Sequence, residues 1–237
     1  MEKSNHEGYL KALNKISEAI TSDLYLEDIL KLIVTLTANV MGAKICNVWL
    51  LDEKNQEFNI KATQAMSEEY LKKRTIKLTE GIVGLAAREK RPIIISDVLS
   101  DKRYKEKNLA RKEGLVSMAS LPMMVKDKVI GVLNIYTTNP YDFTRADINL
   151  LSTVANQAAM AIEKTELIVK TKIIQEELET RKKVEKAKGI LMREKKISED
   201  EAFSLMRKSS MNKRISMKDI AEAIILSYEI RENSKIT

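Results

Sequence analysis

The sequence is poor in the residues that most often build catalytic and metal sites. Its 237 residues include one cysteine, one histidine and three prolines. A single cysteine excludes an internal disulfide, and one cysteine with one histidine cannot supply the ligands of a Cys/His zinc site. We therefore expect neither a metal site nor chemistry that depends on clustered cysteines or histidines.

Long apolar runs are also missing. No run is long enough to span a bilayer, and the N-terminal stretch MEKSNHEGYLKALNK lacks the apolar segment of a secretory signal. The apolar fraction of 44% is nevertheless ordinary for a folded protein. These features predict a cytoplasmic globular protein without a membrane partner.

Charge is distributed unevenly along the chain. The 41 basic and 34 acidic side chains leave a net charge of +7. Residues 170–237 hold 17 of the basic and 12 of the acidic ones, so this shorter segment carries +5 of the excess. The asymmetry indicates an anionic partner, such as nucleic acid, for the C-terminal part; a solvated helical surface is the alternative.

The first two thirds of the chain predict an α+β domain. Apolar residues recur at helical spacing over residues 9–41, in two helices, and Gly42 is placed to end the second. Six later segments have strand character: AKICNVWLLD and EFNIKATQA, which suit a hairpin, then RTIKL, PIIISD, SMASLPMMV and KVIGVLNIYTT. Short helices are predicted at 67–73 and 81–90, whereas residues 100–114 are predicted to be irregular. The result is a largely antiparallel sheet flanked by helices.

A long helical pattern begins after Thr144 and meets no glycine or proline before Gly189. Its apolar residues alternate three and four positions apart, as in the seam of a coiled coil. One small domain cannot cover so long a helix, so residues 166–181 are predicted to form a linker in a parallel dimeric coiled coil. A helix broken near Thr171 in a monomer is the alternative. The predicted dimer seam comprises Ile148, Leu151, Ala155, Ala158, Ile162, Val169 and Ile173.

The end of the chain, residues 182–232, predicts a small three-helix bundle. Two segments match the capping-box pattern that opens a helix, one from Ser198 to Glu201 and one from Ser216 to Asp219. Each precedes an amphipathic pattern. With the end of the long helix, these two helices can enclose a core.

Several of these segments resemble a GAF domain. The similarity is carried by LTEGIVGLAAREKRPIIISDV, SMASLPMMVKDKVIGVLNIYTT and DFTRADINLLSTVANQAAMAIE. It divides the chain into an N-terminal helix at 1–24 and a GAF-like domain at 25–165. It implies a sensor and dimerisation module that responds to a small-molecule effector or a partner, or one that binds nothing and serves dimerisation alone. The residue set associated with cyclic-nucleotide binding is not found, so no cofactor is assigned.

A ligand pocket in this domain would be lined by strand residues and their neighbours. The candidates are Trp49, Ile82, Ile95, Ser120, Asn134 and Tyr136, of which Trp49 and Tyr136 suit a plain core equally well. Cys46 follows a strand pattern and is interpreted as a small buried apolar residue. An enzyme is not expected; a GAF-type methionine sulfoxide reductase would need reactive cysteines.

Residues 187–225 resemble an ANTAR domain, an RNA-binding module that prevents transcription termination. The matching stretch is AKGILMREKKISEDEAFSLMRKSSMNKRISMKDIAEAII. The resemblance implies a homodimer that binds paired hairpins in leader RNA, under the control of the GAF domain. The alternative is a GAF-based dimeric protein-interaction module without RNA binding, whose bundle would expose an apolar patch.

RNA loops display phosphates and splayed bases, which lysine and arginine meet with charge and serine and asparagine with directional hydrogen bonds. The predicted RNA contacts are Lys188, Arg193, Lys208, Ser210, Asn212, Lys213 and Arg214. Phe203 is interpreted as a core residue rather than a platform for base stacking.

Overall fold

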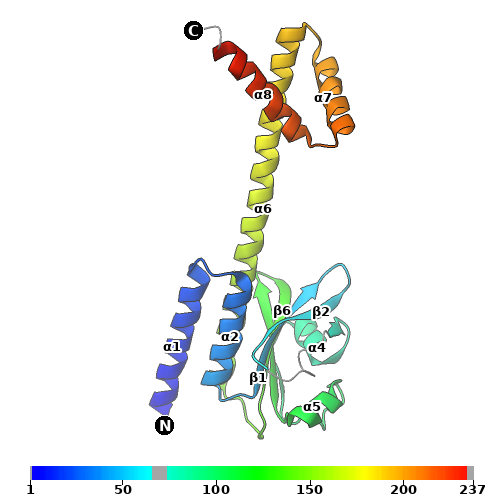
Figure 1. Ribbon diagram of the computed structural model, residues 1–237. Helices are drawn as coiled ribbons and strands as arrows, with labels where there is room; N and C mark the ends of the chain where they lie inside the picture. Colours follow the sequence, from blue (N-terminus) through cyan, green and yellow to red (C-terminus); the bar gives the residue numbers. More distant parts are fainter. Residues whose placement is uncertain (1, 66–73, 234–237) are drawn as a thin grey trace. The chain divides into compact units, whose positions relative to one another are not determined.

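The computed structural model describes residues 2–65 and 74–233 of the chain (Figure 1). The helix predicted at 67–73 lies outside these residues. The chain divides into two compact units, Met1–Thr165 and Glu166–Thr237, and each is described by itself.

In the first unit, the described residues form one antiparallel sheet of six strands. Their order across the sheet is β3 (Thr75–Lys77), β2 (Glu57–Thr63), β1 (Ile45–Asp52), β6 (Lys128–Tyr136), β5 (Met118–Val125) and β4 (Ile93–Ile95). Every neighbouring pair is antiparallel. The predicted β1–β2 hairpin and the predicted α+β class are confirmed.

Helices cover both faces of the sheet. Helices α1 (Glu2–Thr21), α2 (Leu26–Val40) and the first part of α6 (Arg145–Lys195) lie on one side, and α4 (Gly81–Glu89) and α5 (Lys107–Glu113) lie on the other (Figure 1). Helix α5 falls in the stretch predicted to be irregular, so that prediction was wrong. Its seven residues bury only Ala110, and so short and charged a helix has almost no apolar period to detect.

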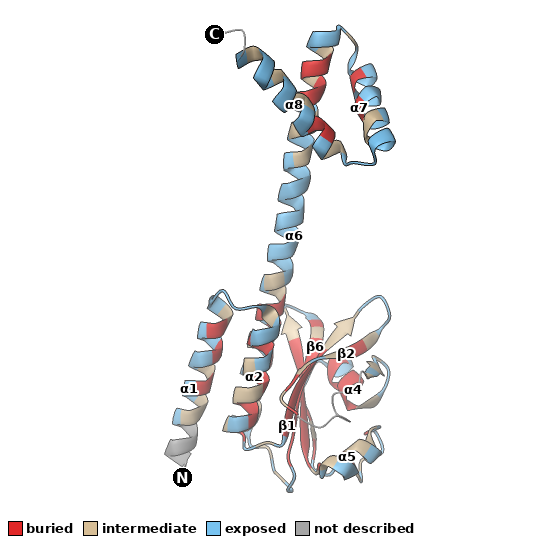
Figure 2. Cartoon of the chain, in the orientation of Figure 1, coloured by how far each residue is buried: buried red, intermediate tan, exposed pale blue. Residues whose placement is uncertain are grey.

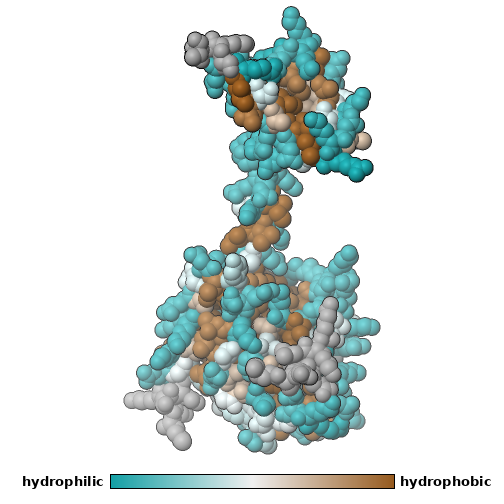
Figure 3. Space-filling view, viewed as in Figure 1, coloured by the Kyte–Doolittle hydropathy of each residue, from teal (hydrophilic) through white to brown (hydrophobic). Residues whose placement is uncertain are grey.

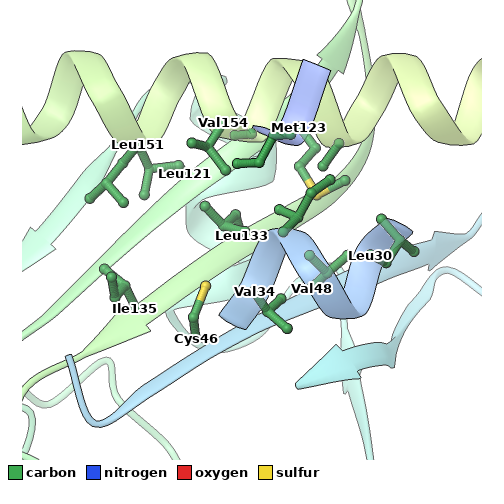
Figure 4. Close-up of a cluster of buried hydrophobic side chains, with 14 of the residues drawn as sticks. Leu30, Val34, Cys46, Val48, Leu121, Met123, Leu133, Ile135, Leu151 and Val154 are labelled. Atoms are coloured by element: carbon green, nitrogen blue, oxygen red, sulfur yellow. The ribbon is translucent and has the colours of Figure 1, made fainter. Parts of the chain in front are cut away.

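The alternation of side chains along the strands creates two separate cores. On the first face, Cys46 and Val48 of β1 join Leu133 of β6 beneath α2 and α6, as Figure 4 shows. On the second face, Trp49 and Val132 pack with α4 and α5. Cys46 is fully buried, which confirms its interpretation as a core residue.

Four residues of the predicted dimer seam belong to the first core. Leu151, Ala155, Ala158 and Ile162 are all at most 3% exposed and pack on the sheet of their own unit. These residues are therefore not free to contact a second copy, which corrects the prediction. The three-and-four spacing identified an apolar face of α6 correctly, but spacing alone does not tell what covers that face.

The remaining seam residues have other environments. Ile148 is half-buried, whereas Val169 and Ile173 are exposed. Every residue from Glu166 to Glu179 is exposed in the single chain, which the pale-blue stretch of α6 in Figure 2 shows. This part of α6 makes no core of its own.

In the second unit, α7 (Glu199–Lys213) and α8 (Met217–Asn233) follow the end of α6. Both predicted capping boxes are present: Ser198 and Glu201 exchange hydrogen bonds at the start of α7, and Ser216 and Asp219 do so before α8. The core consists mainly of small and flexible side chains: Ala187, Leu191, Ala202, Met206, Ile220 and Ala221. The predicted three-helix bundle is confirmed.

A buried carboxylate connects helices α1 and α6 in the first unit. Asp147, near the start of α6, is 2% exposed and accepts hydrogen bonds from the Tyr9 hydroxyl at 2.7 Å and the Tyr141 hydroxyl at 3.1 Å. Thr144 adds bonds from its backbone amide and its hydroxyl, each at 2.8 Å. Burial alone would raise the pKa of Asp147, but the bonds from Tyr9, Thr144 and Tyr141 outweigh it and hold the pKa below its usual value.

We predict that Tyr9→Phe lowers the free energy of unfolding of the first unit by about 1–2 kcal/mol, because it removes a hydrogen bond to a charged group. The loss should shrink as the pH falls below about 4. An aspartate whose pKa is depressed in the folded state stabilises that state only where it is ionised.

Urea unfolding of the full chain at pH 7 and at acid pH measures both effects. Tyr25→Phe is the matched control, because Tyr25 is 82% exposed. Equal stability of the Tyr9 and Tyr25 variants at pH 7 would contradict the prediction.

Candidate functional site

An exposed cationic segment lies at the end of α7 and in the turn after it. Lys208, Asn212, Lys213 and Arg214 are all exposed. Arg214 ends the helix in the left-handed conformation, with a φ of 53°. Within the described part of the chain, no carboxylate forms an ion pair with Lys208, Lys213 or Arg214. Their charges are therefore available to an anionic partner.

Lys188, in contrast, is engaged inside the second unit. Its side chain is 9% exposed, and its ammonium group lies 2.6 Å from a carboxylate oxygen of Glu199 and 2.9 Å from one of Glu185. These hydrogen bonds raise the pKa of Lys188 above its usual value. The expectation that Lys188 contacts RNA is corrected: it lies on the side of α6 that faces α7, and the sequence did not reveal this orientation.

Two other predicted contacts also have intramolecular partners. Ser210 donates a hydrogen bond from its hydroxyl to the Ile215 carbonyl at 2.6 Å, which stabilises the turn between α7 and α8. The Arg193 guanidinium lies 5.8 Å from the centre of the Tyr228 ring. Arg193 remains exposed, so its charge still contributes to this surface.

The second unit also exposes more apolar surface than the sequence suggested (Figure 3). Phe203 is 43% exposed, so the expectation that it packs in the core was wrong. The other large apolar side chains exposed on α7 and α8 are Leu205, Met211, Leu226 and Ile230. The bundle is too small to bury all of its apolar residues. The helical spacing of apolar residues in the sequence gives no information on how many of them a bundle of this size can bury.

In the first unit, the predicted pocket residues gather at the second core. Trp49, Ile82, Ile95 and Tyr136 are all at most 3% exposed and belong to this core. Ser120 and Asn134 stand opposite each other on β5 and β6, and both are fully buried. Alternation along these strands directs them to the face that α4 and α5 cover.

Three of these side chains carry buried polar atoms without a hydrogen-bond partner in the described part of the chain. They are the indole nitrogen Nε1 of Trp49, the hydroxyl of Ser120 and both amide atoms of Asn134. Buried polar groups are nearly always paired, and leaving one unpaired costs about 1–3 kcal/mol. Such a concentration of unpaired groups in one layer is more typical of a ligand site than of a core.

A small cavity of about 120 Å³ lies beside this layer. Ile82 and Tyr136 border it, together with Gly81 and Tyr104. The rings of Tyr104 and Tyr136 meet edge to face with their centres 6.4 Å apart. Trp49, Ile95, Ser120 and Asn134 do not border this cavity as the structure stands.

In residues 2–65 and 74–233, no group of three or more histidine, cysteine, aspartate or glutamate side chains is placed to hold a metal ion. No helix in those ranges is long and apolar enough to cross a membrane. Burial raises the pKa of the Cys46 thiol, which disfavours the reactive thiolate.

The fold and these two sites define a regulatory protein, in which a sensor-type α+β domain precedes a small basic helical module. Residues 24–163 match the GAF domain family, and residues 173–225 match the ANTAR domain. The chain belongs to the GAF domain family and carries an ANTAR domain after it. Both are sensor or regulatory domains rather than catalytic ones.

Similar proteins agree with this division. The phosphoenolpyruvate-dependent phosphotransferase system protein of Escherichia coli is 24% identical over 158 residues, which cover 67% of this chain and 21% of that protein. The transcriptional regulatory protein PdtaR of Mycobacterium tuberculosis is 40% identical over 52 residues, which cover 22% of this chain and 25% of that protein. The chain thus spans about a fifth to a quarter of the length of these relatives.

Solved structures confirm the fold of the first unit. The GAF domain of an Acinetobacter phosphoenolpyruvate-protein phosphotransferase superposes with a TM-score of 0.60 at 26% identity, covering 68% of this chain and 97% of that one. The free methionine-R-sulfoxide reductase of Neisseria meningitidis superposes with a TM-score of 0.59 at 18% identity, covering 68% and 91%. At that identity, the likeness to the reductase concerns the fold alone.

We predict that Ser120→Ala raises the free energy of unfolding of the ligand-free first unit by about 1 kcal/mol, because it removes a buried hydroxyl that has no hydrogen-bond partner among the described residues. Ser117→Ala is the matched control. Ser117 is equally buried, but its hydroxyl donates to the Ser96 carbonyl at 2.7 Å and accepts from the Tyr141 amide at 3.0 Å.

The control should therefore lose stability where Ser120→Ala gains it. Thermal unfolding of protein refolded from denaturant, and so freed of bound molecules, measures both changes. A loss of stability in both variants would show that Ser120 is an ordinary core residue.

Proposed function

We propose that this protein is a signal-responsive antiterminator, whose ANTAR domain binds paired hairpins in leader RNA and whose GAF domain controls that binding. The observation that supports RNA binding most directly is the exposed group of Lys208, Lys213 and Arg214, none of which has an ion-pair partner among the described residues, on a domain of ANTAR type. The net charge of +5 over residues 170–237 strengthens the attraction to a polyanion.

The competing function is a protein-interaction module without RNA binding. It is favoured by one observation, the apolar side chains of Met211, Leu226 and Ile230, each more than half exposed on the second unit. An exposed apolar patch often marks a protein interface. RNA-binding measurements separate the two functions.

The sensor role rests on the unpaired polar atoms of Trp49, Ser120 and Asn134. A ligand that restores their hydrogen bonds would be small, uncharged or zwitterionic, and rich in donors and acceptors. Such a ligand would stabilise the first unit as it binds. Native mass spectrometry of the purified full chain would detect it as an added mass, and this mass should be weaker in Ser120→Ala.

The protein is proposed to act as a homodimer, joined through an exposed stripe on α6. The stripe consists of Leu167, Ile174 and Leu178, which are each more than half exposed. At about 100° per residue, these three side chains lie within about 40° of one another, whereas Val169 and Ile173 lie about 160° and about 120° round the helix from Leu167. The separation of seven residues between Leu167 and Ile174 is the heptad period of a coiled coil.

The charges beside the stripe suit a parallel pair of helices. If Ile174 occupies a d position, Glu177 falls at g and Lys182 at the following e position. These are the positions from which opposite charges pair between parallel helices. A parallel dimer would bring two ANTAR domains to one RNA, which matches a target of two hairpins.

We predict that replacing both Lys213 and Arg214 by Ala weakens binding of a tandem-hairpin leader RNA about tenfold and lowers the salt slope of log K by roughly 1 to 2, because two phosphate contacts are lost. Filter binding at several stated salt concentrations measures both quantities. Replacing the exposed Lys11 and Lys15 of α1 by Ala is the control with the same loss of charge.

Equal effects of the two double variants would place the contact face elsewhere. The proposed function would be refuted if the wild-type chain bound the leader RNA no more tightly than unrelated RNA, both with and without added small molecules.

We further predict that Ile174→Glu shifts the full chain from dimer to monomer, because it puts like charges face to face in the seam. Ile173→Glu makes the same chemical change one residue earlier, about 100° round the helix at the outward-facing c position, and should leave the dimer intact. Sedimentation equilibrium of both variants measures the association constant. A wild-type monomer at high micromolar concentration would refute the proposed seam.

A further inference from the structure

The second unit contains a groove of about 780 Å³ to which all three of its helices contribute. Its floor is apolar and includes Leu191, Met206, Ile220 and Ile224. Of these, Ile224 belongs only to the partly buried rim of the core. The groove therefore exposes apolar surface that the three-helix core does not cover.

The borders of the groove are polar and largely cationic. Lys195 of α6 and Lys213 of α7 line it, and neither forms an ion pair with a carboxylate in the part of the chain that the structure describes. Ser209 and Ser227 add hydroxyl groups to its walls. Glu194 also lines it, but its carboxylate lies 3.2 Å from the guanidinium of Arg231.

This combination of surfaces narrows the choice of occupant. A nucleobase has two apolar faces and a polar edge, and the phosphates on either side of it are anionic. An apolar floor, hydroxyl-bearing walls and free lysines complement these three features in turn. An apolar helix from another protein would use the floor but would gain nothing from Lys195 and Lys213.

We propose that this groove receives an unstacked base from the loop of an RNA hairpin, with Lys195 and Lys213 holding the flanking phosphates. The proposal rests on the RNA binding proposed above and gives it a specific site. In this arrangement, the groove supplies discrimination between loop sequences, whereas Lys208 and Arg214 supply affinity that is independent of sequence.

The test fills the groove without changing its charge. Ser209→Phe places a ring in the groove wall, and Ser204→Phe is the matched control, because Ser204 is exposed on α7 and does not line the groove. Ala223→Leu narrows the groove from α8 and serves as a second variant if Ser209→Phe does not fold. Circular dichroism and thermal unfolding establish that each full-length variant is folded.

The RNA probe is a hairpin that the wild-type full chain selects from a pool with randomised loops, and 2-aminopurine then replaces one loop base at a time. We expect Ser209→Phe to bind this RNA about tenfold more weakly, in line with the loss of one stacked or inserted base, at an unchanged salt slope. We also expect the wild type and Ser204→Phe, but not Ser209→Phe, to raise the fluorescence of one substituted base.

The possible outcomes distinguish a failure of the groove proposal from a failure of the proposed RNA-binding function. If the wild type selects no RNA, the proposed function fails. If it selects RNA and both groove variants bind that RNA as tightly as Ser204→Phe does, RNA binding stands and the groove proposal is overturned. A changed oligomeric state of the groove variants with unaltered RNA binding would overturn it too, and would assign the groove to a second copy of the chain.

Discussion

The burial of one face of α6 against the sheet of the first unit is the constraint on which the other assignments depend. Leu151, Ala155 and Ile162 use that face for the core of their own domain. Only the remaining faces of α6 are left for a partner, and only beyond Thr165 are they apolar over a useful length. In the proposed dimer, one helix would thus use one face for folding and another for association.

The sequence predicted the fold well wherever a feature was local. The capping boxes at Ser198 and Ser216, the β1–β2 hairpin and the helix end at Gly42 each depend on residues close together in the chain, and all are present. Helix α5 was missed because a short charged helix on a surface carries little apolar period.

The sites were harder to predict than the fold, because they depend on which way a side chain faces in three dimensions. Lys188 has the charge expected of an RNA contact, yet it is used in ion pairs with Glu185 and Glu199. The groove in the second unit was not foreseen at all. It combines Lys195, Met206 and Ser227, residues from three helices that no single motif brings together.

The exposed stretch of α6 from Glu166 to Glu179 has a consequence for the physics of signalling. This segment buries no side chain in the single chain, so the flanking turns of α6 and its own backbone hydrogen bonds are its main support. Pairing with a second copy would add the contacts that the segment lacks. In the proposed dimer, the stability of this segment would then depend on protein concentration and on any signal that alters pairing, so the segment would couple the two domains thermodynamically.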